Sequence, residues 1–97
     1  MSKLFSIGEL LIDFQSVGTG GLKETKQFIK NAGGAPANVC VQAVKLGQKA
    51  VYLTKVGNDG FGDFLIETLK NEGVDVTFIS KSDKYDTSLA FVSFKDG

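Results

Sequence analysis

The chain has 97 residues, enough for one domain at most. Its eleven lysines and eleven acidic residues give a formal net charge of zero, so no general attraction to nucleic acid or to an anionic membrane is expected. It contains neither arginine nor histidine, which excludes arginine clamps on phosphate and histidine general bases within it. The single cysteine, Cys40, excludes an intrachain disulfide and a cysteine-cluster metal site, and it favours a reducing, cytoplasmic setting. No apolar stretch is long enough to span a bilayer.

The first predicted element is a strand over residues 4–14. Its run Leu-Phe-Ser-Ile-Gly-Glu-Leu-Leu-Ile-Asp-Phe is largely apolar on both faces, as in a buried strand of a parallel sheet. Asp13 stands near the carboxyl end of this run, where open α/β sheets bind ligands. Its carboxylate could accept two hydrogen bonds from sugar hydroxyls. The alternative is that Asp13 ends the strand and faces water.

A long excursion separates Phe14 from Gly33, where an ordinary strand-to-helix connection needs only about 2–6 residues. It contains the run Gly18-Thr19-Gly20-Gly21, which has neither the GxGxxG nor the GxxxxGK[ST] spacing of a phosphate-binding loop and predicts a flexible turn. Residues 26–30 predict a short strand. This strand could form part of a lid over the end of the sheet that carries Asp13.

The stretch Ala-Gly-Gly-Ala-Pro-Ala-Asn over residues 32–38 joins a paired-glycine turn to the start of a helix. Gly33 and Gly34 allow positive φ and leave the backbone N–H groups open to close approach. Pro36 suits the first helical position, which would put Asn38 among the free donors of the first turn. A neutral polyol could be held there by the backbone donors and the Asn38 side chain. The alternative is a tight turn with Asn38 as a local helix cap.

Helices and strands alternate through the middle of the chain. The predicted elements are a helix from Pro36 to Leu46 followed by Gly47, a strand over 50–56, a helix capped by Asn58 or Asp59 and ended by Gly73, and a strand over 74–79. The apolar face of the first helix includes Cys40, which is expected to lie in the core. This order implies right-handed parallel crossovers in an α/β layer fold.

Residues 87–94 predict a further strand with apolar side chains on both faces, so we expect it to be covered by a ligand or by another subunit. One face carries Ser88, Ala90 and Val92, and the other carries Leu89, Phe91 and Ser93. Lys95-Asp96-Gly97 then predicts a hairpin turn with no returning strand. We therefore expect the sequence to have been cut short.

Three stretches together resemble the first signature of the ribokinase-like (PfkB) carbohydrate kinases, in the form most similar to fructokinases. They are Gly33-Gly34-Ala35-Pro36-Ala37-Asn38-Val39, Val56-Gly57-Asn58-Asp59-Gly60-Phe61-Gly62, and the upstream run from Gly8 to Phe14. The resemblance covers essentially the whole chain and matches the amino-terminal third of such kinases. It implies a partial ribokinase-like, Rossmann-like α/β layer fold with parallel strands, helices and part of a small β lid. The lid segments would be about 15–32 and 87–97, and the body segments 3–14 and 33–80.

The resemblance also implies an activity, which is transfer of the ATP γ-phosphoryl group to a hydroxyl of a fructose-like sugar with the help of Mg²⁺. Asp13 and Asn38 would hydrogen-bond sugar hydroxyls, while Gly33 and Gly34 would approach the sugar and form the hinge between lid and body. One face of the strand over 87–94 would line the pocket, and either face could do so. The lid could pair with that of a second subunit in a homodimer.

The second signature of these kinases, which carries the catalytic aspartate and an anion hole, has no match in the chain, and the ATP pocket belongs to the same part. We therefore expect no catalytic residue here, ATP and Mg²⁺ bound by the missing part, and no activity of the chain alone. Alternatives are a 2-keto-3-deoxygluconate kinase, a ribokinase, or a non-catalytic sugar-binding or dimerisation module. A small nucleotide-binding α/β protein would need a glycine-rich loop after the first strand, and the sequence has none.

Overall fold

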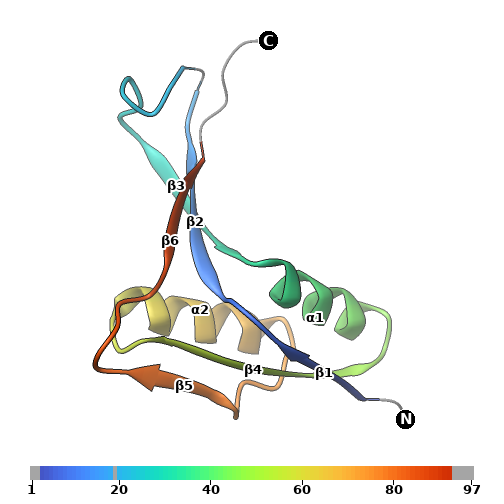
Figure 1. The fold of residues 1–97 in the computed structure, drawn as a ribbon. Helices are drawn as coiled ribbons and strands as arrows, with labels where there is room; N and C mark the ends of the chain where they lie inside the picture. Colours follow the sequence, from blue (N-terminus) through green and yellow to red (C-terminus); the bar gives the residue numbers. More distant parts are fainter. Residues whose placement is uncertain (1–2, 19, 93–97) are drawn as a thin grey trace.

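The computed structural model describes residues 3–18 and 20–92, in which six strands form two separate sheets (Figure 1). The elements are β1 (Lys3–Ile7), β2 (Leu11–Ser16), β3 (Phe28–Gly33), α1 (Ala35–Lys45), β4 (Lys49–Gly57), α2 (Gly60–Asn71), β5 (Ile79–Ser82) and β6 (Leu89–Val92). Strands β1, β4 and β5 form the body sheet, and strands β3, β2 and β6 form the small sheet. The predicted α/β fold with parallel strands is confirmed.

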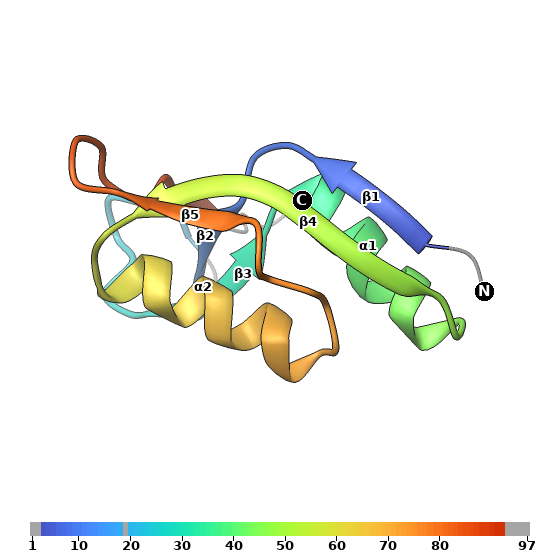
Figure 2. The ribbon, with the colours of Figure 1, turned by 90° about the horizontal axis from the view of Figure 1, so that it is seen from below.

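The body sheet has strand order β1-β4-β5, with both pairs parallel. Figure 2 shows α1 and α2 on the same side of this sheet. The core between them includes the fully buried Tyr52, Leu65 and Cys40, as predicted for the cysteine. On β1, however, Phe5 is 60% and Ile7 77% exposed, because the helices cover only one face of the sheet. The prediction that both faces of the first strand are buried is therefore wrong in the described structure.

The two helices begin and end close to where their local signals predict. Gly34 is the N-cap of α1 with φ of 110°, so Pro36 takes the second helical position and Asn38 the fourth, one later than expected. No side chain caps α1, so the alternative of Asn38 as a local cap is not supported. Gly47, with φ of 89°, follows α1 as predicted. Asp59, one of the two predicted caps, accepts a hydrogen bond at the start of α2.

The strand predicted over residues 4–14 is in fact two strands in different sheets. β1 pairs with β4 in the body sheet, whereas β2 pairs with β3 and β6 in the small sheet. Asp13 therefore does not end a body strand, and the expected body segment 3–14 includes residues of the small sheet. Gly8 and Glu9 interrupt the apolar run at the break, and a glycine within a strand pattern is a local sign of a bend.

Packing at the β1–β2 connection explains why the chain leaves the body sheet there. A Cβ at Gly8 would lie 2.5 Å from Cγ of Pro36, so this glycine lets the connection pass close to the start of α1. The hydroxyl of Tyr52 donates to the carbonyl oxygens of Gly8 and Glu9, at 3.1 and 2.7 Å. Burial raises the pKa of Tyr52 to about 12, because it disfavours the charged phenolate.

The strand predicted over 74–79 forms later than expected, as β5 over Ile79–Ser82. Within the predicted range, a single isolated parallel bridge joins Asp75 to Val51 of β4. The Asp75 carboxylate accepts the Thr77 N–H at 2.9 Å. This local side-chain bond favours a turn where the apolar pattern favours a strand.

The small sheet projects from the body (Figure 1), and the described molecule is elongated, with extents of 48 × 33 × 19 Å. β2 is its central strand, antiparallel to β3 and parallel to β6. The predictions of strands near 26–30 and within 87–94 are confirmed by β3 and β6. Residues 93–97, with the predicted hairpin turn, lie outside the described residues.

Candidate functional site

Asp13 lies in the middle of β2, directly between Asn31 of β3 and Ala90 of β6. Residues paired across neighbouring strands share a face of the sheet, so these three side chains point the same way. Gln15 and Val92 form the next pair on that face. A hollow of about 420 Å³ is lined there by Asp13, Gln15, Asn31 and Val92. The half-buried carboxylate of Asp13 thus faces an open depression, which it lines together with two amides and one valine.

Gly33 is the residue against which the Asp13 carboxylate packs. A Cβ at Gly33 would overlap Oδ2 of Asp13 and would lie 3.1 Å from Cδ1 of Leu11. Its backbone has no positive φ, in contrast to Gly34 with φ of 110°. The sequence allows positive φ at both glycines, but only Gly34 has it. A side chain at position 33 would therefore displace the Asp13 carboxylate.

Gly34 brings the β3–α1 junction against the connection between β1 and β2. A Cβ here would overlap the carbonyl oxygen of Glu9 and would lie 3.6 Å from Cα of Leu10. Two of the crossings between body and small sheet therefore touch at this glycine. The contact is backbone against backbone, so no side-chain rotation can relieve an added methyl group.

Asn38 is exposed on α1 and borders a different hollow, of about 240 Å³, to which Asn31 and Thr68 also contribute. Among the described residues, no hydrogen bond and no shared hollow joins Asn38 to Asp13. Asn31 lines both depressions. The structure thus brings Asp13 and Gly33 into contact, whereas Asn38 lines a separate hollow that Asn31 also borders.

Two polar residues beside Asp13 were not predicted from the sequence. Asn31 Nδ2 donates to Gln15 Oε1 at 3.4 Å, so the two amides and the carboxylate lie together on one face. The only signal that could reveal them is the register of β2 against β3, which a single sequence does not contain. A carboxylate offers acceptors and two amides offer both donors and acceptors, a set suited to hydroxyl groups.

The opposite face of the small sheet is aromatic and packs its base on α2. Phe14 stacks on Phe91 with ring centroids 5.1 Å apart, and it meets Phe61 of α2 edge-on at 5.6 Å. Lys30 Nζ lies 4.3 Å from the ring centroid of Phe64 in the same helix. These contacts distinguish the two faces of β6. Ala90 and Val92 share the face of Asp13, and Phe91 lies on the other.

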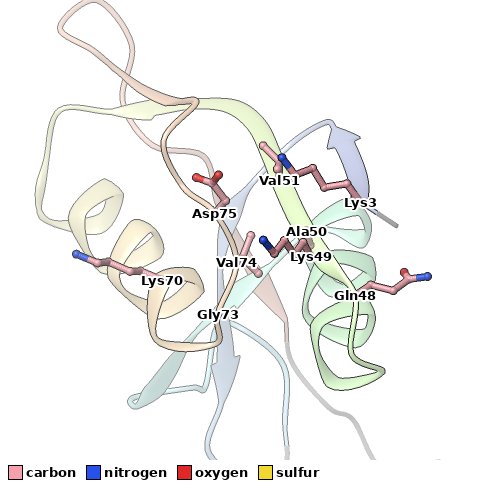
Figure 3. Close-up of a pocket in the computed structure, with 9 residues that line it drawn as sticks. All are labelled: Lys3, Gln48, Lys49, Ala50, Val51, Lys70, Gly73, Val74 and Asp75. Atoms are coloured by element: carbon pink, nitrogen blue, oxygen red, sulfur yellow. The ribbon is translucent and has the colours of Figure 1, made fainter. Parts of the chain in front are cut away.

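A further hollow, of about 400 Å³, lies at the amino ends of β1 and β4 (Figure 3). Lys3, Lys49 and Lys70 contribute to it, and Figure 3 shows their side chains leaving three different elements without converging. Open α/β sheets bind ligands at the carboxyl ends of their strands. This hollow is at the wrong end of the sheet, and the Asp13 face remains the candidate site.

The described ranges, 3–18 and 20–92, contain no group of three His, Cys, Asp or Glu side chains that could hold a metal ion. They contain no helix that is both long and apolar enough to cross a membrane. The glycine clusters in these ranges also lack the spacing of a phosphate loop.

Comparison with known proteins identifies the family. The family model for pfkB family carbohydrate kinases matches residues 1–97. The chain belongs to the pfkB family of carbohydrate kinases. This confirms the resemblance seen in its glycine motifs.

Individual pfkB relatives agree in sequence and in fold. A sugar kinase of Pyrococcus horikoshii is 52% identical over 90 residues, which are 93% of this chain and 29% of that protein. A fructokinase of Solanum tuberosum is 41% identical over 93 residues, 95% of this chain and 29% of that protein. The crystal structure of an uncharacterized sugar kinase from P. horikoshii in complex with ATP superposes with a TM-score of 0.93 at 50% identity, covering 97% of this chain and 31% of that one. The chain thus spans about three-tenths of the length of these relatives.

Proposed function

We propose that the chain is the amino-terminal portion of an ATP-dependent, fructokinase-like sugar kinase, and that the small sheet is the lid of its sugar site. The observation that carries the proposal is the Asp13 carboxylate packed on Gly33, with Asn31 on the same face of a projecting sheet. Membership of the pfkB family and the fructokinases among its relatives support a sugar as substrate. The complex of a relative with ATP supports ATP as the phosphoryl donor.

In this proposal the residues of the chain bind and orient the sugar. Asp13 accepts hydrogen bonds from two sugar hydroxyls, Gly33 leaves room for its carboxylate, and Asn38 binds a further hydroxyl near the start of α1. Gly34 is the hinge between lid and body. The lid also pairs with that of a second subunit in a homodimer. ATP and Mg²⁺ are bound by residues outside this chain, and positioning of the sugar is this segment's contribution to phosphoryl transfer.

The proposal is tested by assaying the full-length protein for ATP-dependent phosphorylation of fructose, 2-keto-3-deoxygluconate and ribose. We expect the highest kcat/KM with fructose, and no turnover by the 97-residue chain alone. If 2-keto-3-deoxygluconate or ribose gives the highest kcat/KM, that sugar replaces fructose as the proposed substrate, and the family stays the same. Turnover by the short chain, or no phosphorylation of any sugar by the full-length protein, would contradict the proposal.

Substitution Gly33→Ala tests the contact that carries the proposal. The added Cβ overlaps Asp13 Oδ2 and displaces the carboxylate, and a misplacement of about 1 Å costs on the order of 10²-fold in rate. We therefore expect kcat/KM for fructose to fall by about 10²-fold in the full-length kinase. The double variant Gly33→Ala with Asp13→Ala has no carboxylate for the new Cβ to displace. Its activity should therefore equal that of Asp13→Ala alone.

The matched control is Gly60→Ala, because a Cβ at that exposed glycine would meet nothing within 4 Å. This variant should retain the activity of the wild type. If the losses from Gly33→Ala and Asp13→Ala add instead, position 33 acts independently of the carboxylate and the proposed contact is wrong.

A further inference from the structure

One carboxylate, that of Asp59, joins three elements of the fold. It accepts the Gly62 N–H at the start of α2 (2.7 Å), and it accepts the N–H and the hydroxyl of Thr87 (3.0 and 2.7 Å). The Thr87 hydroxyl in turn accepts the Gly57 N–H at the end of β4 (3.0 Å). Thr87 is only 5% exposed, so water competes little for these bonds. We call the four residues Gly57, Asp59, Gly62 and Thr87 the clasp.

The glycines of the clasp leave no space for a side chain. A Cβ at Gly62 would overlap the carbonyl oxygen of Gly57 and would lie 3.2 Å from Oγ1 of Thr87. A Cβ at Gly57 would overlap the Asp59 carboxylate and the backbone of Thr87. Hydrogen bonds from Thr87, followed by that from Gly62, lower the pKa of Asp59, because they stabilise the ionised form of its carboxylate.

The clasp holds the chain just before it enters the small sheet. The residue after Thr87 is Ser88, whose carbonyl accepts the Ile12 N–H of β2 at 3.0 Å. Two residues further on, Ala90 of β6 lies directly opposite Asp13. Ala90, the strand position that flanks the Asp13 carboxylate, therefore lies only three positions after Thr87.

Within residues 3–18 and 20–92 the backbone passes between the small sheet and the body at three crossings, and the clasp lies at one of them. The other two, Gly8–Leu10 and Gly33–Gly34, touch each other and lead to β2 and β3. The clasp leads to β6, on the opposite edge of the sheet from β3. A tether at this separate edge restrains rotation of the sheet about the junction at the paired glycines.

We propose that Asp59 and Thr87 are positioning residues for the sugar site, which set the angle of the small sheet and thereby the place of Asp13 over the body. This inference rests on the proposed function. Neither residue lines the hollow beside Asp13, so both act through β6 and its pairing with β2.

The test compares Thr87→Val with Thr87→Ser in the full-length kinase. Valine keeps the size of the side chain but removes the hydroxyl, which both donates to Asp59 and accepts from Gly57. Because hydrogen bonds to charged groups are the stronger ones, we expect KM for fructose to rise about tenfold in Thr87→Val, with kcat and KM for ATP unchanged. Thr87→Ser, which restores the hydroxyl, should stay close to the wild type.

A second variant and a control accompany this pair. Asp59→Asn keeps an oxygen to cap α2 but cannot accept from both donors of Thr87, so it should raise KM for fructose as Thr87→Val does. Asp63→Asn removes an exposed carboxylate from the first turn of the same helix and should change neither KM.

Amide hydrogen exchange provides a readout that does not require activity. In Thr87→Val the β6 amides should exchange faster than in the wild type, while the β4 amides stay protected, except that of Gly57, which loses its acceptor. Unchanged β6 exchange would overturn the inference, as would an unchanged KM for fructose. If amide exchange became equally faster across β4 and β6, and KM for both fructose and ATP changed, the clasp would contribute to folding alone. If the wild type phosphorylates no sugar, the proposed function fails, and the exchange data still decide whether the clasp holds β6.

Discussion

Asp13→Ala in the full-length kinase is expected to lower kcat/KM for the sugar by at least about 10²-fold and to leave the Kd for ATP unchanged. Each hydrogen bond to a charged group is worth about 1.5–3 kcal/mol, and the proposal gives Asp13 two of them. A fall in kcat/KM measures lost stabilisation of the transition state relative to free enzyme and sugar. Steady-state kinetics with varied sugar, together with calorimetric titration of ATP, provide the two measurements.

Asp75→Ala is the control for this prediction. It removes an exposed carboxylate that accepts a local hydrogen bond from the N–H of Thr77, so neither sugar turnover nor ATP affinity should change. Asp13→Asn keeps one acceptor oxygen and should recover part of the loss. If Asp13→Ala reduces sugar turnover and ATP affinity equally, with a lower Tm, the residue has a folding role instead.

The second large effect is expected for Gly34→Ala, which should lower the free energy of unfolding by about 3 kcal/mol or more. A φ of 110° strains any residue with a Cβ, at a cost of about 1–3 kcal/mol. The new Cβ would also overlap the carbonyl oxygen of Glu9, and this backbone atom cannot move away as a side chain could. Urea denaturation of the full-length protein measures the change.

Gly47→Ala isolates the cost of the overlap. Gly47 also has positive φ, 89°, but a Cβ there would meet nothing within 4 Å. It should therefore cost only the backbone strain, about 1 kcal/mol. If the two variants lost the same free energy of unfolding, the overlap with Glu9 would contribute nothing to the loss in Gly34→Ala. That result would contradict the close packing of the two crossings.

Local signals in the sequence determined the helices, most of the strands and the family. Pro36 and Gly47 bracket α1, and Asp59 caps α2, because caps and turns depend on residues a few positions apart. The spacing of apolar residues also indicated β4 and the short strands β3 and β6. The glycine motifs identified the pfkB family, which the match over residues 1–97 confirms. The roles of Asp13, Gly33, Gly34 and Asn38 stay predictions.

Only the tertiary structure decided where these elements pair and which side chains meet. The apolar residues on both sides of Gly8 and Glu9 were predicted to form one strand, but the packing of Gly8 on Pro36 and the hydroxyl of Tyr52 divide them between two sheets. Asn31 lies beside Asp13 because of the register between β2 and β3. Thr87 reaches Asp59 across 28 positions in the chain. Such contacts depend on strand register and long-range hydrogen bonds, and the periodicity of a single sequence records neither.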